Sequence, residues 1–392
     1  MIERTKLREL VELQRGQSYK GTLLGEPGPV LLGLGTINRN GGFRADKLKT
    51  YGCQSSPKIL LGPGDLYVSL KDVTHAADLL GAVARVPESI EIGRLTQDTV
   101  RLEIKSRSVN NDYLYWALQT PEYRSYCRLR GTGTTNLDLS RNDFLEFTIR
   151  LPETREQQAI AEVLGALDDK IAANAKLVAT TQELLGSLLH GRATTIALGE
   201  IVDHRKRTID VSGVAAPTVY HFSLPAFDKS EMPDVANPTS IMSSKFLVEE
   251  PSVLISKLNP RTPRIWDIQE IPDELALAST EFLVLQPRYS STTVLWAILS
   301  QPAFTSRLAG KVSGTSGSHQ RVKPGDLLAT ETIDPRLIDV GLQITMTALG
   351  KRAQSARLEN QTLAESRDAL LPQLMSGKLR VRDAEKAVEA VV

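Results

Sequence analysis

The sequence predicts an α+β fold in which two similar domains are separated by a pair of long coiled-coil helices. A heptad pattern lies in the middle of the chain, the same pattern returns near the end, and short apolar alternations fill the stretches before each. With 392 residues, 41% of them hydrophobic and 24% charged, the chain is globular and too long for one ordinary core. We expect a domain, a helix, a second domain and a second helix with a tail, at residues 1–150, 151–191, 192–337 and 338–392.

The first long helix is expected to include the segment LPETREQQAIAEVLGALDDKIAANAKL, residues 151–177. Its seam positions alternate at spacings of four and three, as in a coiled coil. Pro152 and the nearby acidic residues suit the first turn of a helix, and Gly191 suits a C-terminal cap. The seam positions are Ile160, Leu164, Leu167, Ile171, Asn174, Val178, Thr181, Leu185 and Leu188.

The second long helix repeats this register 182 residues later. Pro372 and Gly377 are expected to break it, which gives each helix about 35 residues, or roughly 50 Å. The two helices are predicted to pack on each other because each has a narrow apolar stripe, with the polar residues Asn174 and Asn360 fixing the register. The second seam consists of Leu342, Met346, Leu349, Ala353, Ala356, Asn360, Leu363, Arg367 and Leu370.

The stretches before the helices repeat as well. GDLYVSLKD parallels PSVLISKLN, and helices are expected near residues 110–127 and 292–308. Alternations such as VLISKL and EFLVLQ predict short strands, separated by Gly and Pro clusters. Matching positions in the two halves are Ser69 and Ser256, Pro121 and Pro302, Tyr123 and Phe304, and Asp143 and Asp326.

Composition limits the possible functions. The net charge of +1 means that any nucleic-acid binding must rest on local basic patches. Cys53 and Cys127 lie far apart and form no CxxC motif, so neither a disulfide framework nor a zinc site is expected. The start of the chain, MIERTKLREL, is charged, and no run of about 18 apolar residues occurs, so we expect a cytoplasmic protein without a membrane segment.

Three stretches resemble the DNA-specificity subunit of type I restriction-modification systems. Residues 151–177 are similar to the central conserved region of that family, and LENQTLAESRDALLPQLMSGKLRV at 358–381 is similar to its distal conserved region. SSKFLVEEPSVLISKLNPRTPRIW at 243–266 is typical of one class of its target-recognition domains. Together with the internal repeat, the resemblance covers nearly the whole chain.

The resemblance implies a subunit without catalytic activity of its own. It would have two target-recognition domains, at residues 1–150 and 192–337, separated by antiparallel helices. Each domain would read one half of a bipartite, asymmetric site in double-stranded DNA. The helices would set the spacing and dock two copies of a modification methyltransferase subunit, and an ATP-dependent restriction subunit would join the complex.

The candidate DNA contacts in the second domain come from SKLNPRTPR, a loop that follows a predicted strand. Lys257, Asn259, Arg261 and Arg264 combine cations for phosphates with a polar side chain for base edges. Read without the resemblance, the same residues are ordinary charges of a solvated loop; the resemblance favours DNA contact.

The first domain offers Ser69 and Lys71 at the matching position, followed by Thr74 and His75. Two loops rich in Ser, Thr and Gly form a second candidate surface, whose small hydroxyls and amides suit phosphate and base contacts as well as they suit simple turns. These loops contribute Thr134 and Asn136 from GTGTTN, and His319, Gln320 and Arg321 from GTSGSHQR. The basic run 204–207 is interpreted as phosphate steering or plain surface.

Enzyme motifs are missing from the sequence. GLGTIN and GTGTTN lack the third glycine of a dinucleotide loop, no GxxxxGK[ST] loop occurs, and five histidines show no metal-ligand spacing. We therefore expect no catalytic residues, no metal and no cofactor. The alternative to a DNA-binding subunit is a scaffold whose helices hold two protein-binding domains apart.

Overall fold

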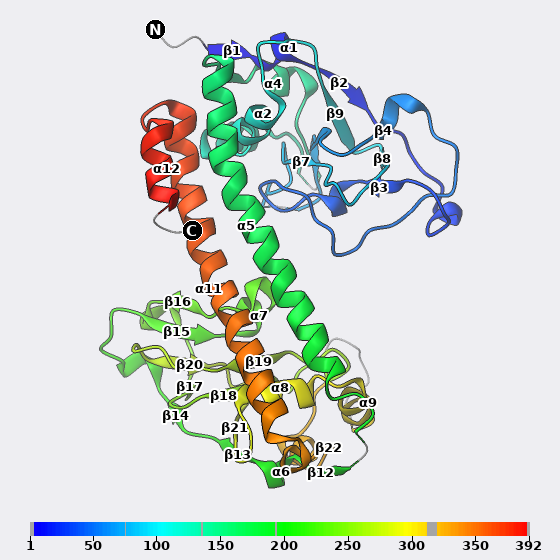
Figure 1. Cartoon of the computed structure of the whole chain (residues 1–392). Coiled ribbons are helices and arrows are strands. Elements are labelled where there is room, and N and C mark those ends of the chain that lie inside the picture. Colours follow the sequence, from blue (N-terminus) through cyan, green and yellow to red (C-terminus); the bar gives the residue numbers. More distant parts are fainter. Residues whose placement is uncertain (1–3, 75, 135, 193, 312–319, 390–392) are drawn as a thin grey trace. The chain divides into compact units, whose positions relative to one another are not determined.

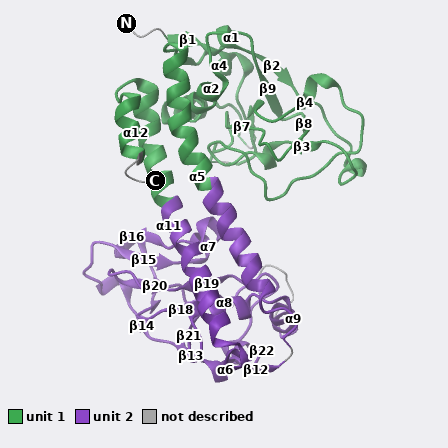
Figure 2. Cartoon of the chain, viewed as in Figure 1, with its two compact units in different colours: residues 1–171, 361–392 green, residues 172–360 purple. Residues whose placement is uncertain are grey.

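A computed structural model describes residues 4–74, 76–134, 136–192, 194–311 and 320–389 of the chain (Figure 1). The chain divides into two compact units, of which unit 1 holds residues 1–171 and 361–392 and unit 2 holds residues 172–360 (Figure 2). Each of the two long helices, α5 (Thr154–Ser187) and α11 (Val340–Ser376), contributes one part to each unit. The expected α+β class with long paired helices is confirmed.

The main sheet of unit 1 is antiparallel and has the order β2-β9-β5-β7. Its central strand β5 is buried along its whole length, and alternate side chains enter different cores because a strand has a period of two. Leu66 and Val68 belong to the core that also contains residues of α5 and α11. Tyr67 belongs to a second core, which contains residues of the small three-stranded sheet β3-β8-β4. The main strands are β2 (Val11–Arg15), β5 (Leu66–Ser69), β7 (Val83–Arg85) and β9 (Thr99–Ile104).

Local sequence explains where the helices of unit 1 begin. The helix expected near 110–127 is two helices, because Thr120 caps a new helix and Pro121 occupies its first position. The remaining elements of unit 1 are β1 (Arg4–Lys6), α1 (Leu7–Leu10), β3 (Val30–Leu32), β4 (Leu60–Leu61), β6 (Lys71–Asp72), β8 (Gly93–Leu95), α2 (Asn111–Ala117), α3 (Pro121–Arg130), β10 (Leu137–Asp138), α4 (Arg141–Glu146), β11 (Thr148–Arg150) and α12 (Val381–Glu389).

Unit 2 repeats the main sheet of unit 1 strand for strand. Its order is β13-β21-β18-β19, and all neighbours are antiparallel. The second sheets differ, since unit 1 has the three-stranded order β3-β8-β4 and unit 2 the five-stranded order β14-β17-β20-β15-β16. The main strands of unit 2 are β13 (Val202–Arg205), β18 (Ser252–Ser256), β19 (Ile265–Ile268) and β21 (Phe282–Pro287).

The helices that flank the repeated sheet also follow in the same order. As β1 and β11 do in unit 1, β12 and β22 form a two-stranded antiparallel sheet, and its second strand precedes the long helix. The remaining elements of unit 2 are β12 (Thr195–Ala197), α6 (Leu198–Ile201), β14 (Thr208–Ile209), β15 (Val219–Phe222), α7 (Leu224–Ser230), β16 (Asp234–Ala236), β17 (Lys245–Leu247), β20 (Ala276–Ala278), α8 (Thr292–Leu299), α9 (Pro302–Ala309), α10 (Pro324–Leu328) and β22 (Glu331–Ile333).

The seams of α5 and α11 are buried within each unit. In unit 1, Leu164 and Leu167 of α5 share a core with Leu363 and Leu370 of α11. In unit 2, Leu185 of α5 and Met346 of α11 share a core with α8. The stripe of one helix is therefore covered by the stripe of the other and by the globular part beside it.

Polar seam residues are paired across the two helices. Asn174, which is 4% exposed, donates from Nδ2 to Glu359 at 2.8 Å in unit 2. Arg367 forms an ion pair with Asp168 at 2.5 Å in unit 1, which explains how a charged residue is accommodated on the stripe. Asn360 is half-buried, and the partner of Asn174 is its neighbour Glu359.

The expectation that Pro372 breaks the second helix is wrong. Helix α11 continues through Pro372 to Ser376, although proline removes one backbone donor from the helix interior. Leu371, Leu374 and Met375 are buried in the core of unit 1, and this burial holds the last turn in place. Gly377 then ends the helix with a φ of 74°, a conformation that glycine adopts without strain.

We predict that Leu164→Ala lowers the free energy of unfolding of unit 1 by about 2–5 kcal/mol, because it leaves a cavity at a fully buried seam position. Leu129→Ala in α3 is the matched control, since Leu129 is 85% exposed and should cost less than about 0.5 kcal/mol. Urea titration of the full chain measures the free energy of unfolding of both variants. Equal effects of the two substitutions would show that the seam does not stabilise unit 1.

Candidate nucleic-acid interface

Two segments of unit 2 that are far apart in sequence lie side by side after strand β18. Asn259 N donates to Gln320 O at 3.0 Å, and Val322 N donates to Lys257 O at 3.0 Å. Leu258 and Arg321 form the β-bridge between these two contacts. The fold thus brings Gln320 and Arg321 beside the loop that follows β18, although the two groups of candidates are far apart in the sequence.

These two loops open into a hollow on the surface of unit 2. Four of the predicted residues contribute to its lining, together with an aromatic and an acidic side chain from α7. Such a surface combines donors, acceptors and an apolar face, which suits contact with polar base edges and phosphates. The lining residues are Phe227, Asp228, Asn259, Arg261, Thr262, Pro263, Arg264 and Gln320.

The cations at this hollow differ in how they are paired. Arg264 forms a bidentate ion pair with Asp228, at 2.6 and 2.8 Å, and donating to that carboxylate raises the pKa of the guanidinium. Arg321 pairs with Glu281 at 2.9 Å. Arg261 is exposed, and no ion pair within the described ranges involves it. Arg261 is therefore the cation at the hollow that meets an incoming anion without first giving up an acidic partner.

Asn259 has a defined backbone that presents its amide at the hollow. Its φ of 53° lies in the left-handed region, which asparagine tolerates better than most residues. Thr262 N donates to Asn259 O at 2.9 Å, closing a tight turn. The backbone of this turn therefore fixes where the side chain of Asn259 begins.

Unit 1 builds an equivalent junction. Strand β6 pairs with β10, so that Lys71 lies opposite Asp138 and the loop before β10 is brought beside it. Thr134 and Asn136 in that loop are exposed. Lys71 lies 3.6 Å from Asp98 and 3.9 Å from Asp138, so this cation is partly neutralised.

The two matched serines have a positioning role. Ser69 and Ser256 are fully buried, and their hydroxyls donate to the backbone oxygens of Lys71 and Leu258, respectively. The same hydroxyls accept from the backbone N–H groups of those residues. Because the Ser69 hydroxyl is used and enclosed in this way, it orients Lys71 and is not presented to a ligand.

Sequence reasoning missed the residues that fix the loop after Lys71. The fully buried carboxylate of Asp72 accepts from Thr74 N and Leu79 N, both at 2.6 Å. The buried guanidinium of Arg124 donates to Leu80 O and Asp78 O, both at 2.7 Å, and desolvation lowers its pKa. The spacing of Asp72 to Thr74 is that of a side-chain turn, but no sequence pattern points to Arg124.

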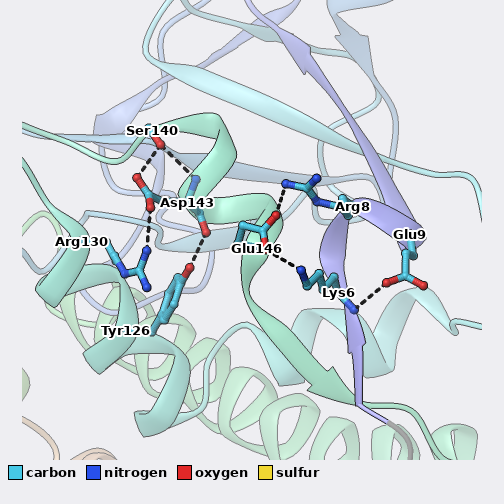
Figure 3. A network of polar contacts seen from close by, with 8 residues as sticks. All are labelled: Lys6, Arg8, Glu9, Tyr126, Arg130, Ser140, Asp143 and Glu146. Atoms are coloured by element: carbon cyan, nitrogen blue, oxygen red, sulfur yellow. Dashed lines mark hydrogen bonds and ion pairs between the residues drawn. The ribbon is translucent and has the colours of Figure 1, made fainter.

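A polar network holds the other end of the unit 1 loop (Figure 3). Ser140 caps α4, and its hydroxyl contacts Asp143, which also pairs with Arg130 at 2.9 Å. The bond from Ser140 and then that from Arg130 hold the pKa of Asp143 below its ordinary value. Glu146 binds Lys6 and Arg8 of the first strand and helix. The loop that holds Thr134 and Asn136 thus ends on a fixed helix.

The basic run 204–207 in unit 2 lines a second hollow whose charges largely cancel. Arg207 pairs with Glu249 at 2.5 Å, and Glu250 also lines this hollow. Arg205 donates to the side chain of Gln286. Desolvation lowers the pKa of His204 and favours its neutral form. This arrangement fits a surface whose positive and negative charges offset each other better than it fits a phosphate-binding patch.

Two predicted residues, His319 and His75, lie outside the described residues. Within the described ranges, no group of three or more His, Cys, Asp or Glu side chains is arranged to hold a metal ion. None of the helices in that part of the chain combines the length and apolarity needed to cross a bilayer.

Comparison with known proteins supports the class indicated by this architecture. A family model described as the type I restriction modification DNA specificity domain matches residues 64–180, from β5 into α5. No curated protein matches the sequence. The S subunit of a type I restriction-modification system from M. genitalium is 16% identical, with a TM-score of 0.58 over 95% of this chain and 96% of that chain. The HsdS subunit from Thermoanaerobacter tengcongensis is 14% identical, with a TM-score of 0.36 over 96% and 97%.

Residues 64–180 are therefore similar to the type I restriction modification DNA specificity domain, and the chain shares the fold of the M. genitalium S subunit. The resemblance predicted from the sequence is confirmed. The matched segment includes Lys71, Thr134 and Asn136 of unit 1, whereas the hollow of unit 2 lies outside it.

We predict that Asp228→Asn tightens binding of the full chain to duplex DNA about three- to tenfold at 0.1 M salt, because it releases Arg264 for a phosphate. Asp273→Asn removes the same charge from an exposed position outside the hollow and serves as the control. Fluorescence anisotropy with a labelled duplex measures both. If the two variants change affinity equally, Arg264 does not contact DNA.

Proposed function

We propose that the chain is a sequence-specific, double-stranded DNA-binding subunit that recognises a bipartite, asymmetric site through its two units. Lys71, Thr134 and Asn136 of unit 1 contact one half-site. Lys257, Asn259, Arg261, Arg264, Gln320 and Arg321 of unit 2, with His319 as a further candidate, contact the other. Bound in this way, the chain directs the enzymatic subunits of a type I restriction-modification complex.

The observation that supports a split site most strongly is the repeated junction. In both units a buried serine ends the central strand, the next residues pair with a distant loop, and a short helix fixes the end of that loop. One scaffold thus presents two different sets of side chains. Different side chains on equivalent loops would read different bases, which gives an asymmetric site.

Roles for individual side chains follow from their chemistry. Asn136, Asn259 and Gln320 have amides, the groups that pair in bidentate fashion with adenine. Arg261 suits guanine or a phosphate, and Lys71 and Lys257 suit phosphates. Arg264 and Arg321 exchange their carboxylate partners for phosphates when DNA arrives, so their contribution to affinity is smaller than that of Arg261.

The partners proposed for the chain are two copies of a modification methyltransferase subunit and a restriction subunit. The long helices offer polar outer faces on both units, and two equivalent faces suit two copies of one partner. The chain itself has no proposed catalytic residue, metal or cofactor. We propose that it acts in the cytoplasm, where its DNA substrate is found.

We predict that replacing Lys257, Arg261 and Arg264 together with glutamine weakens duplex binding roughly 10²–10³-fold at 0.1 M salt, because three phosphate-neutralising charges are lost. A variant with glutamine at Lys176, Lys351 and Arg352 removes the same charge from exposed helix positions of unit 2 and should stay within a factor of about three. If the first variant binds DNA as tightly as the second, the scaffold interpretation is favoured.

We predict that methylation of random duplex DNA by the chain together with its methyltransferase subunit reveals a split consensus. Asn259→Gly keeps the left-handed backbone, which glycine adopts freely, and removes only the amide. This variant should relax the consensus at one half-site and leave the other unchanged, while Asn136→Ala should relax the opposite half. Methylation without a split consensus, or equal methylation in the absence of the chain, would rule out the proposed function.

A further inference from the structure

The loops that follow strand β2 in unit 1 are strongly basic. Residues 16–58 contain six Lys or Arg residues and only two acidic residues, although the whole chain has a net charge of +1. Four of the six, Lys20, Lys47, Lys49 and Lys58, are lysines. This segment precedes residue 64, where the match to the DNA specificity domain begins.

The corresponding segment of unit 2 has the opposite balance. Residues 206–250, which follow strand β13, contain four Lys or Arg residues and six acidic residues. The main sheets, whose strands β2 and β13 precede the two segments, have the same strand order. The basic character is thus a property of the loops of unit 1 and not of the repeated scaffold.

The lysines of this segment are available to an anion. Lys20, Lys47, Lys49 and Lys58 are exposed, and no ion pair in the described part of the chain involves them. Arg44 is neutralised through a bidentate contact with Asp46 at 2.6 and 2.7 Å. The charge of the loops therefore faces solvent.

Backbone contacts bring the lysine-bearing loops together. Gly25 N donates to Thr50 O at 3.0 Å, Leu31 N to Lys49 O at 2.8 Å, and Gly52 N to Leu23 O at 3.1 Å. The stretch around residues 20–31 and the stretch around 47–52 therefore lie side by side. In Figure 1 these blue loops extend from the small sheet of unit 1 on the side away from α5.

A buried arginine, for which no acidic partner is found among the described residues, holds this pair of loops together. Arg94 is 4% exposed and donates to Ser18 O at 3.0 Å and to the hydroxyl of Ser55 at 2.9 Å. Its guanidinium also stacks on the ring of Tyr51 at 4.7 Å. A cation enclosed in this way is stabilised only if its donors are satisfied, so the loops are held in a defined arrangement.

A hairpin that includes Asn40 connects the basic loops to the junction at Lys71. Asn40 N donates to Asp78 O at 2.8 Å, which ties the hairpin to the loop that Asp72 and Arg124 hold in place. Arg39 is exposed beside this contact, and no ion pair among the described residues involves it. The positive surface thus continues from the lysine-bearing loops toward the proposed base contacts of unit 1.

We propose that the loops of residues 16–58 bind the sugar-phosphate backbone of DNA and provide most of the electrostatic attraction between unit 1 and its half-site. This inference rests on the proposed function and assigns the phosphate contacts that Lys71, with its two acidic neighbours, supplies only weakly. A phosphodiester backbone matches the surface because exposed, unpaired lysines neutralise a dense array of negative charges without requiring a particular sequence.

The test compares two full-length variants with equal loss of charge. The loop variant has glutamine at Lys20, Lys47 and Lys49. The control variant has glutamine at Lys105, Arg107 and Arg155, three exposed cations of unit 1 outside these loops for which no ion pair is found among the described residues. Thermal melting confirms that both fold, and duplex binding is measured between 50 and 200 mM salt.

The loop variant should reduce the slope of log K against log salt by about 2.7, since each phosphate contact contributes about 0.9. Between 50 and 200 mM salt, the affinity of the wild-type chain for the duplex should therefore fall by a factor roughly 40 times larger than the affinity of the loop variant does. The control should change the slope by less than about 0.5. Equal slopes for the two variants, with wild-type DNA binding intact, overturn this inference alone. A wild-type chain that does not bind duplex DNA overturns the proposed function as well.

If the loop variant lost binding to an acidic protein and bound DNA as the wild-type chain does, the inference would also be overturned, and the surface would be assigned to a protein partner.

Footprinting supplies an independent readout. Protection of backbone positions from hydroxyl radicals should disappear beside one half-site in the loop variant and remain beside the other. Loss of protection at both half-sites would show that the loops do not act through unit 1.

Discussion

The mutual burial of two narrow helical stripes is the constraint on which the rest of this structure depends. Neither α5 nor α11 has an apolar face wide enough to bury itself on the globular part of one unit alone. Leu164 and Leu167 meet Leu363 in the core of unit 1, and Leu185 shares a core with Met346 in unit 2. The helical segments that meet in each unit are therefore separated by more than a hundred residues of chain. Folding of either unit is coupled to the presence of both helices.

The repeated sheet imposes the same geometry on both junctions. Strands β5 and β18 are buried on both faces, which leaves little freedom for their side chains, and each ends in a serine whose hydroxyl turns the following residues toward a distant loop. Loops beyond that turn face solvent, so their composition can differ without cost to the core. The two halves therefore share a scaffold and differ in charge and in the side chains presented.

Periodic features were predictable from the sequence, and contacts between distant residues were not. The heptads, the repeat and the strands follow from spacing alone, because burial of one face imposes a period. Pro372 was misjudged because core packing of its neighbours outweighs one lost hydrogen bond. The sequence offers Ser69 as a candidate DNA contact but does not show its burial, which depends on the sheet around it. The ion pair between Arg264 and Asp228, 36 residues apart, leaves no local pattern in the sequence.

Segregation of charge reconciles a net charge of +1 with a proposed DNA-binding role. Charges act over about 10 Å at 0.1 M salt, so a ligand responds to the nearest surface and not to the sum over the chain. Around the hollow of unit 2, Asp228 and Glu281 pair with Arg264 and Arg321. In the proposed complex with DNA, these pairs would limit attraction to any DNA and leave discrimination to the amides. Lys20, Lys47, Lys49 and Lys58 of unit 1 have no such competitor within the described ranges. Phosphate contacts persist whichever bases are present. In the proposed complex, unit 1 could therefore keep the chain on DNA while the side chains of unit 2 contact successive sequences.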